Sequence, residues 1–492
     1  ENGCNVKLVS FLPSERAQSV MAEGGINAAL NTKDENDSPE EHFTDTIKAA
    51  CGLADPNAVW GMTQAAPELV HWLLKLGVKF NMSGYDDVDL RNFGGQKKKR
   101  TAFAQSDTGK QIMTAMIDAV RRKEASGMVE RFSHHSFLTL RLCDNICCGC
   151  VIRDEYSQET VELPGDAVIV ATGGMHGLFG NTTGSLSNTG EVTAELFRLG
   201  VPLANGEMIQ YHPTTVKCGG KRMLISEAAR GEGGRLFAMK DGKQWYFMEE
   251  KYPELGNLMP RDITAREIWK VSHESEVFLD MTEISEEIIS NKLSGLADDC
   301  MTYLHKDIRK EPVSVLPGIH YFMGGILVDE QHRTPVQNLY AAGECCAQYH
   351  GANRLGGNSL LGALYGGRVA AKSACEQADV VDLSCATQID FPPASQISEI
   401  KQLNKVMQET MGVVRNENTL LNGIQTVQAL TGNLPLLGMA VLKSALARKE
   451  SRGAHWREDY PKSNDNDYLK TTVARFDGKQ IQISFVPVPE RR

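Results

Sequence analysis

The sequence predicts an α/β fold that contains parallel strands. Two short apolar strands, Val168–Ala171 and Leu339–Ala342, each run into glycine: Thr-Gly-Gly at 172–174 and Gly-Glu at 343–344. Buried parallel strands are typically such apolar runs, and their carboxyl ends are where open α/β sheets hold ligands. Stretches with helical periodicity precede and follow these strands, as this class requires.

The other elements are predicted from periodicity and from residues that begin or end helices. A strand is expected at Val6–Val9, ahead of a glycine-rich loop at 22–27. Pro67 favours the first turn of a helix over Pro67–Leu76, because proline lacks the N–H that this position leaves unpaired, and Gly77 ends it. Further helices are expected around Ile112–Val120, over Glu283–Leu296 and across residues 398–450, and strands at Cys147–Ile152 and Ile481–Phe485.

Composition excludes several classes of function. The net charge of −10 argues against extensive nucleic-acid binding, and no apolar run approaches the ~20 residues of a membrane span. The basic tract Lys97–Arg100 is expected as a solvated turn, with attraction of an anionic substrate or cofactor phosphate as the alternative. The twelve cysteines are scattered, so we expect free structural thiols in a reducing cytoplasm; Cys147 and Cys150 leave a redox or metal pair as the alternative.

Charged and imidazole side chains gather in four islands. They are Gln-Tyr-His-Pro-Thr at 210–214, Ser-Glu-Ala-Ala-Arg-Gly-Glu-Gly-Gly at 226–234, Pro-Arg-Asp at 260–262, and a block that joins residues 320–325, 342–344 and 350–360. In the last block the glycines permit close approach to a flat or phosphorylated ligand, and a helix that begins near Ser359 would direct N–H groups at an anion. Each of the first three islands alone is also consistent with a structural turn or salt bridge.

Taken in order, nine segments resemble one family. The set AEGGINAAL, ATGG, QYHPT, SEAARGEGG, PRD, HYFMGG, AAGE, HGANRLGGNSLLGAL and SRGAHWREDYP is similar to the flavoprotein subunit of succinate dehydrogenase and fumarate reductase, to which L-aspartate oxidase is related. The resemblance implies a split Rossmann-like FAD-binding domain with an inserted α+β capping domain, followed by a helical domain and a small C-terminal domain. By motif position, the FAD-binding domain comprises residues 1–210 and 321–392, the cap 211–320, the helical domain 393–452 and the C-terminal domain 453–492.

The resemblance also implies the site residues, none of them a metal ligand. FAD contacts fall on Gly24, Gly25, Thr172, Gly173, Glu344, Asn358, Ser359 and Leu360. Binding of fumarate or succinate falls on His212, Ser226, His320 and Arg354, and catalysis on Arg261 as acid–base with Glu227 and Arg230 as its proton relay. The chemistry suits a dicarboxylate, because a planar guanidinium can hold one carboxylate while imidazoles and a hydroxyl donate to the other. The acid–base role is unusual, since arginine is normally always protonated.

Two departures from the family pattern sharpen the expected activity. Covalently flavinylated members carry a histidine close before the Ala-Glu-Gly-Gly segment, where this chain has Gln18 and no histidine within residues 17–21. We therefore expect non-covalent FAD, a lower flavin potential, and a preference for fumarate reduction. Aspartate oxidases carry a glutamate where this chain has Phe93, so an unsubstituted dicarboxylate is expected. The alternatives are an L-aspartate oxidase or other flavin-dependent dicarboxylate oxidoreductase, and a flavin-free scaffold.

Electrons need a route to or from another protein. The sequence shows no iron–sulfur cysteine pattern and no haem-attachment motif. The family supplies an iron–sulfur subunit and often a membrane anchor, so we expect a cytoplasmic chain, or one held at the cytoplasmic membrane face through partner subunits. Residue 1 is Glu, and no G-x-G-x-x-G turn lies upstream of Ala22. We therefore expect that the chain as written begins inside its FAD-binding domain and by itself binds FAD poorly.

Overall fold

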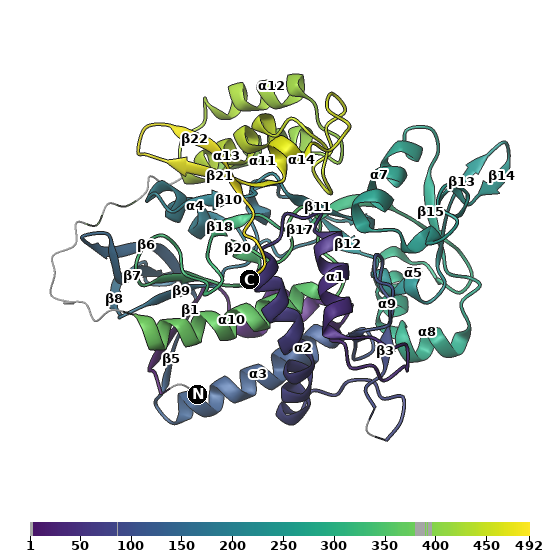
Figure 1. Ribbon diagram of the computed structural model, residues 1–492, viewed down its shortest axis with the longest axis horizontal. Coiled ribbons are helices and arrows are strands. Elements are labelled where there is room, and N and C mark those ends of the chain that lie inside the picture. Colours follow the sequence, from purple (N-terminus) through teal and green to yellow (C-terminus); the bar gives the residue numbers. More distant parts are fainter. Residues whose placement is uncertain (1–2, 86, 379–388, 390, 392–395) are drawn as a thin grey trace.

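The computed structural model describes residues 3–85, 87–378, 389, 391 and 396–492. It contains helices together with parallel, antiparallel and mixed sheets, so the α/β prediction is confirmed (Figure 1). The expected boundary between residues 392 and 393 lies outside the described residues.

The two parallel strands predicted from the sequence lie side by side. β9 (Val168–Val170) pairs in parallel with β19 (Leu339–Ala341), with Val170 opposite Ala341. The segments that begin at Thr172 and Gly343 therefore leave the sheet at the same edge. The expectation of a fully buried strand is wrong for β9, because Ile169 is 41% exposed. A second parallel pair joins β1 (Val6–Ser10) to β5 (Val129–Ser133).

Helix α2 begins eleven residues before the predicted start, and spans Pro56–Leu76. Pro56, not Pro67, occupies the first turn, and the Asp55 side chain accepts hydrogen bonds from the N–H groups of Asn57 and Ala58. An aspartate cap followed by proline is a strong start signal that overrides the later Pro67. Gly77 ends the helix in the left-handed conformation, with φ of 101°, as predicted.

Apart from one helix, the remaining predicted helices and strands agree with the structure in kind. One helix expected over residues 283–296 is wrong: it is divided into α8 (Glu286–Lys292) and α9 (Ser294–Asp299), because Leu293 leaves helical geometry. The confirmed elements are α3 (Thr108–Ala125), β7 (Ile146–Asp154), α11 (Ile397–Thr410), α12 (Glu417–Val427), α13 (Asn433–Ala447) and β22 (Ile481–Pro487).

The segment between β10 (Leu203–Ala204) and β18 (Gly325–Leu327) builds a unit with its own sheet and core, on the right in Figure 1. Its sheet has the strand order β14 (Lys243–Trp245), β13 (Arg235–Lys240), β15 (Val277–Asp280) and β16 (Val313–Ser314). Helix α7 (Arg261–Val271) packs Ile268 and Val271 against Leu236 and Leu279 of this sheet. A separate core therefore supports the part of the chain that carries Arg261.

The C-terminal helices form another core, which lies at the top of Figure 1. Leu403 and Met407 of α11 pack against Leu437 and Val441 of α13. A five-stranded sheet lies beside them, in the order β20 (Cys346–Ala347), β18 (Gly325–Leu327), β10 (Leu203–Ala204), β21 (Lys470–Phe476) and β22. Because the strands of this sheet are far apart in sequence, it joins the C-terminal segment to the middle of the chain.

Buried ion pairs reinforce this junction. The Arg448 guanidinium is fully buried and donates to Glu207, at 2.7 Å, and to Glu450, at 2.8 Å. Arg457 is buried too, and its Nη1 donates to the Ala445 carbonyl at 3.0 Å. The segment SRGAHWREDYP (residues 451–461), which the sequence singled out, thus contributes Arg457 to the buried polar contacts of this junction.

The basic tract Lys97–Arg100 is solvent-exposed at Lys97 and Lys99, as expected, but not at Arg100. Arg100 is fully buried and contacts Asp37, at 2.8 Å, and Asp45, at 3.0 Å. The backbone N–H of Lys99 donates to the Glu35 carboxylate at 2.8 Å. Three acidic residues of segment 35–45 pack against the tract. The local run of four basic residues gives no sign of these partners, because they are distant in sequence.

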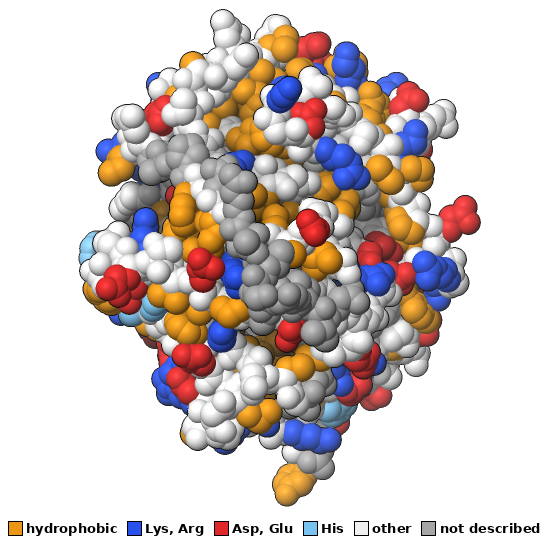
Figure 2. All heavy atoms as spheres, turned by 90° about the vertical axis from the view of Figure 1, so that its left-hand side faces the viewer, with side chains coloured by type: hydrophobic (Ala, Val, Ile, Leu, Met, Phe, Trp, Pro, Cys, Tyr) orange, Lys and Arg blue, Asp and Glu red, His pale blue; other side chains and the backbone are white. Residues whose placement is uncertain are grey.

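The described cysteines include one disulfide pair and several free thiols. Cys4 and Cys375 form a disulfide, which corrects the expectation of free thiols for this pair. Cys147 and Cys148 are buried in β7. In the part of the chain that the structure describes, no helix is long and apolar enough to cross a bilayer. Basic and acidic side chains are intermixed on the face drawn in Figure 2.

Candidate active site

Two neighbouring antiparallel strands bring the two predicted histidines together. β11 (Ile209–Cys218) carries His212 and β17 (Leu316–Phe322) carries His320, and their ring centroids lie 5.0 Å apart. Nδ1 of His320 lies 2.8 Å from the Thr183 hydroxyl, and Nδ1 of His212 accepts the Thr214 N–H at 3.2 Å, which leaves the Nε2 of His212 as the ring N–H donor. Among the described residues neither Nε2 has a hydrogen-bond partner, so both remain available for a ligand.

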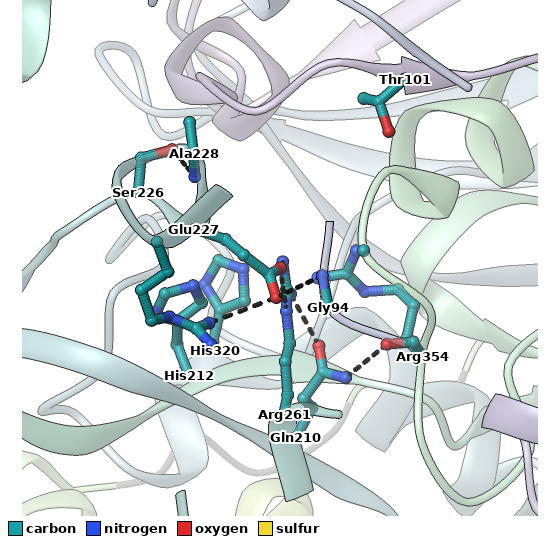
Figure 3. A network of polar contacts seen from close by, with 12 residues as sticks. Gly94, Thr101, Gln210, His212, Ser226, Glu227, Ala228, Arg261, His320 and Arg354 are labelled. Atoms are coloured by element: carbon teal, nitrogen blue, oxygen red, sulfur yellow. Dashed lines mark hydrogen bonds and ion pairs between the residues drawn. The ribbon is translucent and has the colours of Figure 1, made fainter. Parts of the chain in front are cut away.

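Arg261 and Glu227 form a buried ion pair at the centre of the site (Figure 3). Nε and Nη2 of Arg261 both donate to Oε2 of Glu227, at 2.8 and 2.6 Å. The other oxygen, Oε1, accepts from Nη2 of Arg230 and from the Gly94 N–H, each at 3.2 Å. Burial alone would raise the pKa of Glu227, but Arg261 and Arg230 outweigh it and lower that pKa. The carboxylate is therefore an anion that bridges two guanidinium groups.

Arg261 and Glu227 each lie at the N-terminus of a helix. Arg261 is the first residue of α7, where the helix dipole disfavours a positive charge. Glu227 begins the short helix α5 (Glu227–Gly231), where an anion is favoured. The Glu227 carboxylate thus offsets two cations that burial and the dipole would otherwise destabilise.

Arg354 is a buried cation without an anionic partner. It is 3% exposed, its Nε makes no hydrogen bond, and no carboxylate lies within 4 Å of it among the described residues. Burial lowers the pKa of Arg354 to about 9, and the nearby positive charge of Arg261 adds to this. Because an unpaired buried charge is costly, this group is poised to receive an anion.

Both histidines are neutral in this setting. Burial lowers the pKa of His212 and of His320 well below the usual value, and the positive charge of Arg261 acts in the same direction. A neutral imidazole can donate one N–H without adding another charge beside Arg261 and Arg354. Figure 3 shows the two rings on one side of Arg261 and Arg354 on the other, so polar donors flank a central arginine.

Comparison with known proteins decides the family. The family model described as "FAD binding domain" matches residues 1–360, and the model described as "Fumarate reductase flavoprotein C-term" matches residues 430–491. The chain belongs to the succinate dehydrogenase and fumarate reductase flavoprotein family. This flavoprotein is therefore an oxidoreductase with the FAD-binding fold, and the family resemblance seen in the sequence is confirmed.

Similar proteins cover the flavoprotein over nearly its full length. The succinate dehydrogenase flavoprotein subunit of Bacillus subtilis is 37% identical over 100% of this chain and 94% of its own length. The 8-methylmenaquinol:fumarate reductase flavoprotein subunit of Wolinella succinogenes is 31% identical over 99% and 88%. Among solved structures, a mutant quinol fumarate reductase of E. coli matches with a TM-score of 0.88 and 26% identity, over 99% of this chain and 92% of that one.

The flavoprotein's two parallel strands offer a place for the dinucleotide. Thr172 is exposed at the carboxyl end of β9, and Gly173 has φ of 72°. Glu344 follows β19 at the same edge, where its Oε1 accepts the Phe322 N–H at 3.0 Å. Its second oxygen can accept from a ribose hydroxyl, the contact that such strand ends provide. These residues therefore fit FAD.

Other predicted FAD residues of the flavoprotein are internal. A Cβ at Gly25 would lie 2.5 Å from the Ala102 carbonyl, so this glycine is required by packing against β4 (Thr101–Ala102). A Cβ at Gly24 would lie 2.9 Å from the Phe93 ring. These two glycines permit close packing, and their predicted contact with FAD stays a prediction.

Helix α10 (Asn358–Gln377) of the flavoprotein begins in a buried polar network. The Asn358 side chain accepts from Asn27, at 2.7 Å, lies 2.9 Å from Nε2 of His42, and donates to Thr46, at 3.0 Å. It is fully buried, so its side chain positions the helix start. The first-turn N–H groups of Ser359 and Leu360 have no acceptor within the helix, which suits a hydrogen-bond acceptor on a ligand.

Ser226 is not brought into the central cluster of the flavoprotein. Its hydroxyl accepts from the Ala228 N–H at 3.4 Å, and Figure 3 shows it turned toward the start of α5, away from Arg261. Ser226 also faces Glu23, whose pKa burial raises to about 8. The predicted substrate contact of Ser226 stays a prediction.

Gln210 is a residue that motif reasoning missed. Nη1 of Arg261 donates to its Oε1 at 3.0 Å, while its Nε2 donates to the Arg354 carbonyl at 2.8 Å. It therefore ties the two central arginines of the flavoprotein together. The signal was present, because Gln210 and His212 are two apart on one strand and share a face.

Proposed function

We propose that this flavoprotein interconverts fumarate and succinate, with FAD as the hydride carrier. The buried, unpaired Arg354 is the observation that carries the proposal. It faces a pair of neutral histidines across Arg261, which is an arrangement for two carboxylates and not for one. The names of the curated relatives, which include succinate dehydrogenase and fumarate reductase flavoprotein subunits, support it.

Each residue has a defined task. Arg354 binds one carboxylate through its planar fork. His212 and His320 donate from Nε2 to the other carboxylate, which holds the dicarboxylate at both ends. When bound, FAD supplies hydride transfer at its N5 atom. Twisting one carboxylate out of conjugation would polarise the alkene toward that hydride.

A chain of charged side chains delivers the proton to the substrate. Arg261 donates a proton to the carbon that does not receive the hydride, and regains one through Glu227 and Arg230. The contacts of 2.6 and 3.2 Å make this chain continuous.

The proposed activity is tested by an anaerobic assay. We expect the purified holoenzyme to oxidise a reduced viologen dye with fumarate, and to reduce an acceptor dye with succinate more slowly. L-aspartate should not be turned over at a comparable rate, because Phe93 is buried and offers no anion for an ammonium group. Turnover of L-aspartate equal to that of fumarate, or no fumarate reduction, would overturn the proposal.

We propose that the FAD is held without a covalent bond. Gln18 lies in a short 3-10 helix, Gln18–Met21, and its amide cannot form a histidyl–flavin link. We expect acid precipitation of the holoenzyme to leave the flavin in the supernatant, with the Gln18→Ala variant releasing the same fraction. Flavin fluorescence retained in the denatured wild-type pellet would contradict this, whether or not the variant pellet retains it. A non-covalent flavin has a lower potential, which favours fumarate reduction.

The architecture and partners follow from the same assignment. We propose the cap at 211–320 and the two-part FAD-binding domain around it, since separate cores support α7 and α13. We also propose an iron–sulfur subunit as electron partner, with a membrane anchor where the complex has one. The chain then lies in the cytoplasm or at the cytoplasmic face of the membrane.

A further inference from the structure

Arg354 lies beside an aromatic side chain that the proposed mechanism does not use. The carbon at the centre of its guanidinium lies 4.3 Å from the centroid of the Tyr321 ring. A cation at this distance from a ring face is attracted by the negative charge above the ring. Tyr321 therefore helps to stabilise the charge of Arg354 before any ligand arrives, together with the more distant carboxylates of Glu344 and Glu227.

The ring of Tyr321 is held firmly. Tyr321 belongs to β17 and is 7% exposed, packed with Leu53 and Met208. Its other neighbour is His350, whose ring centroid lies 5.3 Å away with planes at 79°. A ring fixed by a strand and by these contacts presents one face to Arg354 in a constant position.

A ring face differs from a carboxylate in what it leaves free. A carboxylate beside Arg354 would occupy the N–H fork and compete with the substrate. A ring attracts the cation without accepting its N–H groups in the plane of the fork, so the fork stays open. Burial and the positive charge of Arg261 both destabilise the charged form of Arg354. The attraction of the ring therefore offsets part of this destabilisation.

We propose that Tyr321 is a positioning residue for dicarboxylate binding: its ring face holds Arg354 charged and oriented, with the guanidinium fork free for a carboxylate. This inference rests on the proposed function of the site. It assigns the effect to the aromatic face, and the phenolic hydroxyl plays no part in it.

The test compares two variants of the holoenzyme that differ in the ring. Tyr321→Phe keeps the face, and Tyr321→Leu replaces it with a smaller apolar side chain that has no ring. We expect Tyr321→Leu to raise KM for fumarate about tenfold, with kcat within about threefold of wild type. The inhibition constant for malonate, a dicarboxylate without a reducible bond, should rise by the same factor. Tyr321→Phe should match wild type within about twofold in all three quantities, with unchanged flavin content.

A second series covers the case in which Tyr321→Leu does not fold. Phenylalanines with increasing fluorine substitution at position 321 keep the shape of the ring. Each fluorine withdraws electron density and makes the ring face less negative. We expect KM for fumarate to rise with each fluorine. A flat series, a wild-type KM in Tyr321→Leu, or a Tyr321→Phe defect as large as that of Tyr321→Leu would overturn the inference. If wild type itself neither reduces fumarate nor binds malonate, the proposed function fails and this inference with it.

Discussion

Replacement of Arg261 with glutamine is expected to lower kcat for fumarate reduction by about 10²–10⁴-fold. The glutamine cannot deliver a proton from a guanidinium, and it loses the two N–H groups that converge on Glu227. Substrate binding should change less, because Arg354 and the two histidines remain. Steady-state kinetics of the purified variant, with kcat and KM measured separately, gives the result.

Two further variants separate the effect on proton delivery from the effect on substrate binding. Arg261→Lys keeps a positive charge but loses the planar fork, so it should recover KM more than kcat. Arg235→Gln is the matched control, because Arg235 is a half-exposed arginine of the same unit that pairs with Glu249. A kcat above one tenth of wild type in Arg261→Gln would exclude Arg261 as the acid.

Replacement of Glu227 with glutamine is the second large effect. It leaves Arg261 and Arg230 buried without an anion, and we expect a loss of about 3–5 kcal/mol in the free energy of unfolding. We also expect kcat to fall at least about 10²-fold, because the relay is broken. Thermal unfolding and steady-state kinetics measure the two losses, and Glu249→Gln at the surface should show neither.

The stability loss should depend on pH with a definite sign. The pKa of Glu227 is lowered from its usual value of 4.5 in the folded chain, so its contribution is present above that value. It declines as the pH falls toward the lower folded pKa. The difference between wild type and Glu227→Gln should therefore be largest near neutral pH and shrink below about pH 4.5. A difference that is constant across this range would contradict the ionised assignment.

The two parallel strands show how far local patterns reach. Apolar runs that end in Thr-Gly-Gly and Gly-Glu predicted β9 and β19, and their adjacent carboxyl ends are found. Pro67 misled the prediction of α2, because a proline inside a long helix has the same local pattern as one at its start. The true start is set by Asp55 and Pro56, which are equally local signals. Periodicity thus identified most elements, while competing start signals misplaced the start of α2 and the break at Leu293 between α8 and α9 was not predicted.

The sequence by itself determined the family and the chemical inventory of the site. Histidine, arginine and glutamate stand in recognisable segments because the reaction needs those side chains. The tertiary structure decided how the charges are used. Arg100 proved to be neutralised by Asp37 and Asp45, while Arg354 lacks a carboxylate and rests on the Tyr321 ring. The physical reason is that the free-energy contribution of a charge depends on its burial and on partners distant in sequence. No local sequence pattern contains that information.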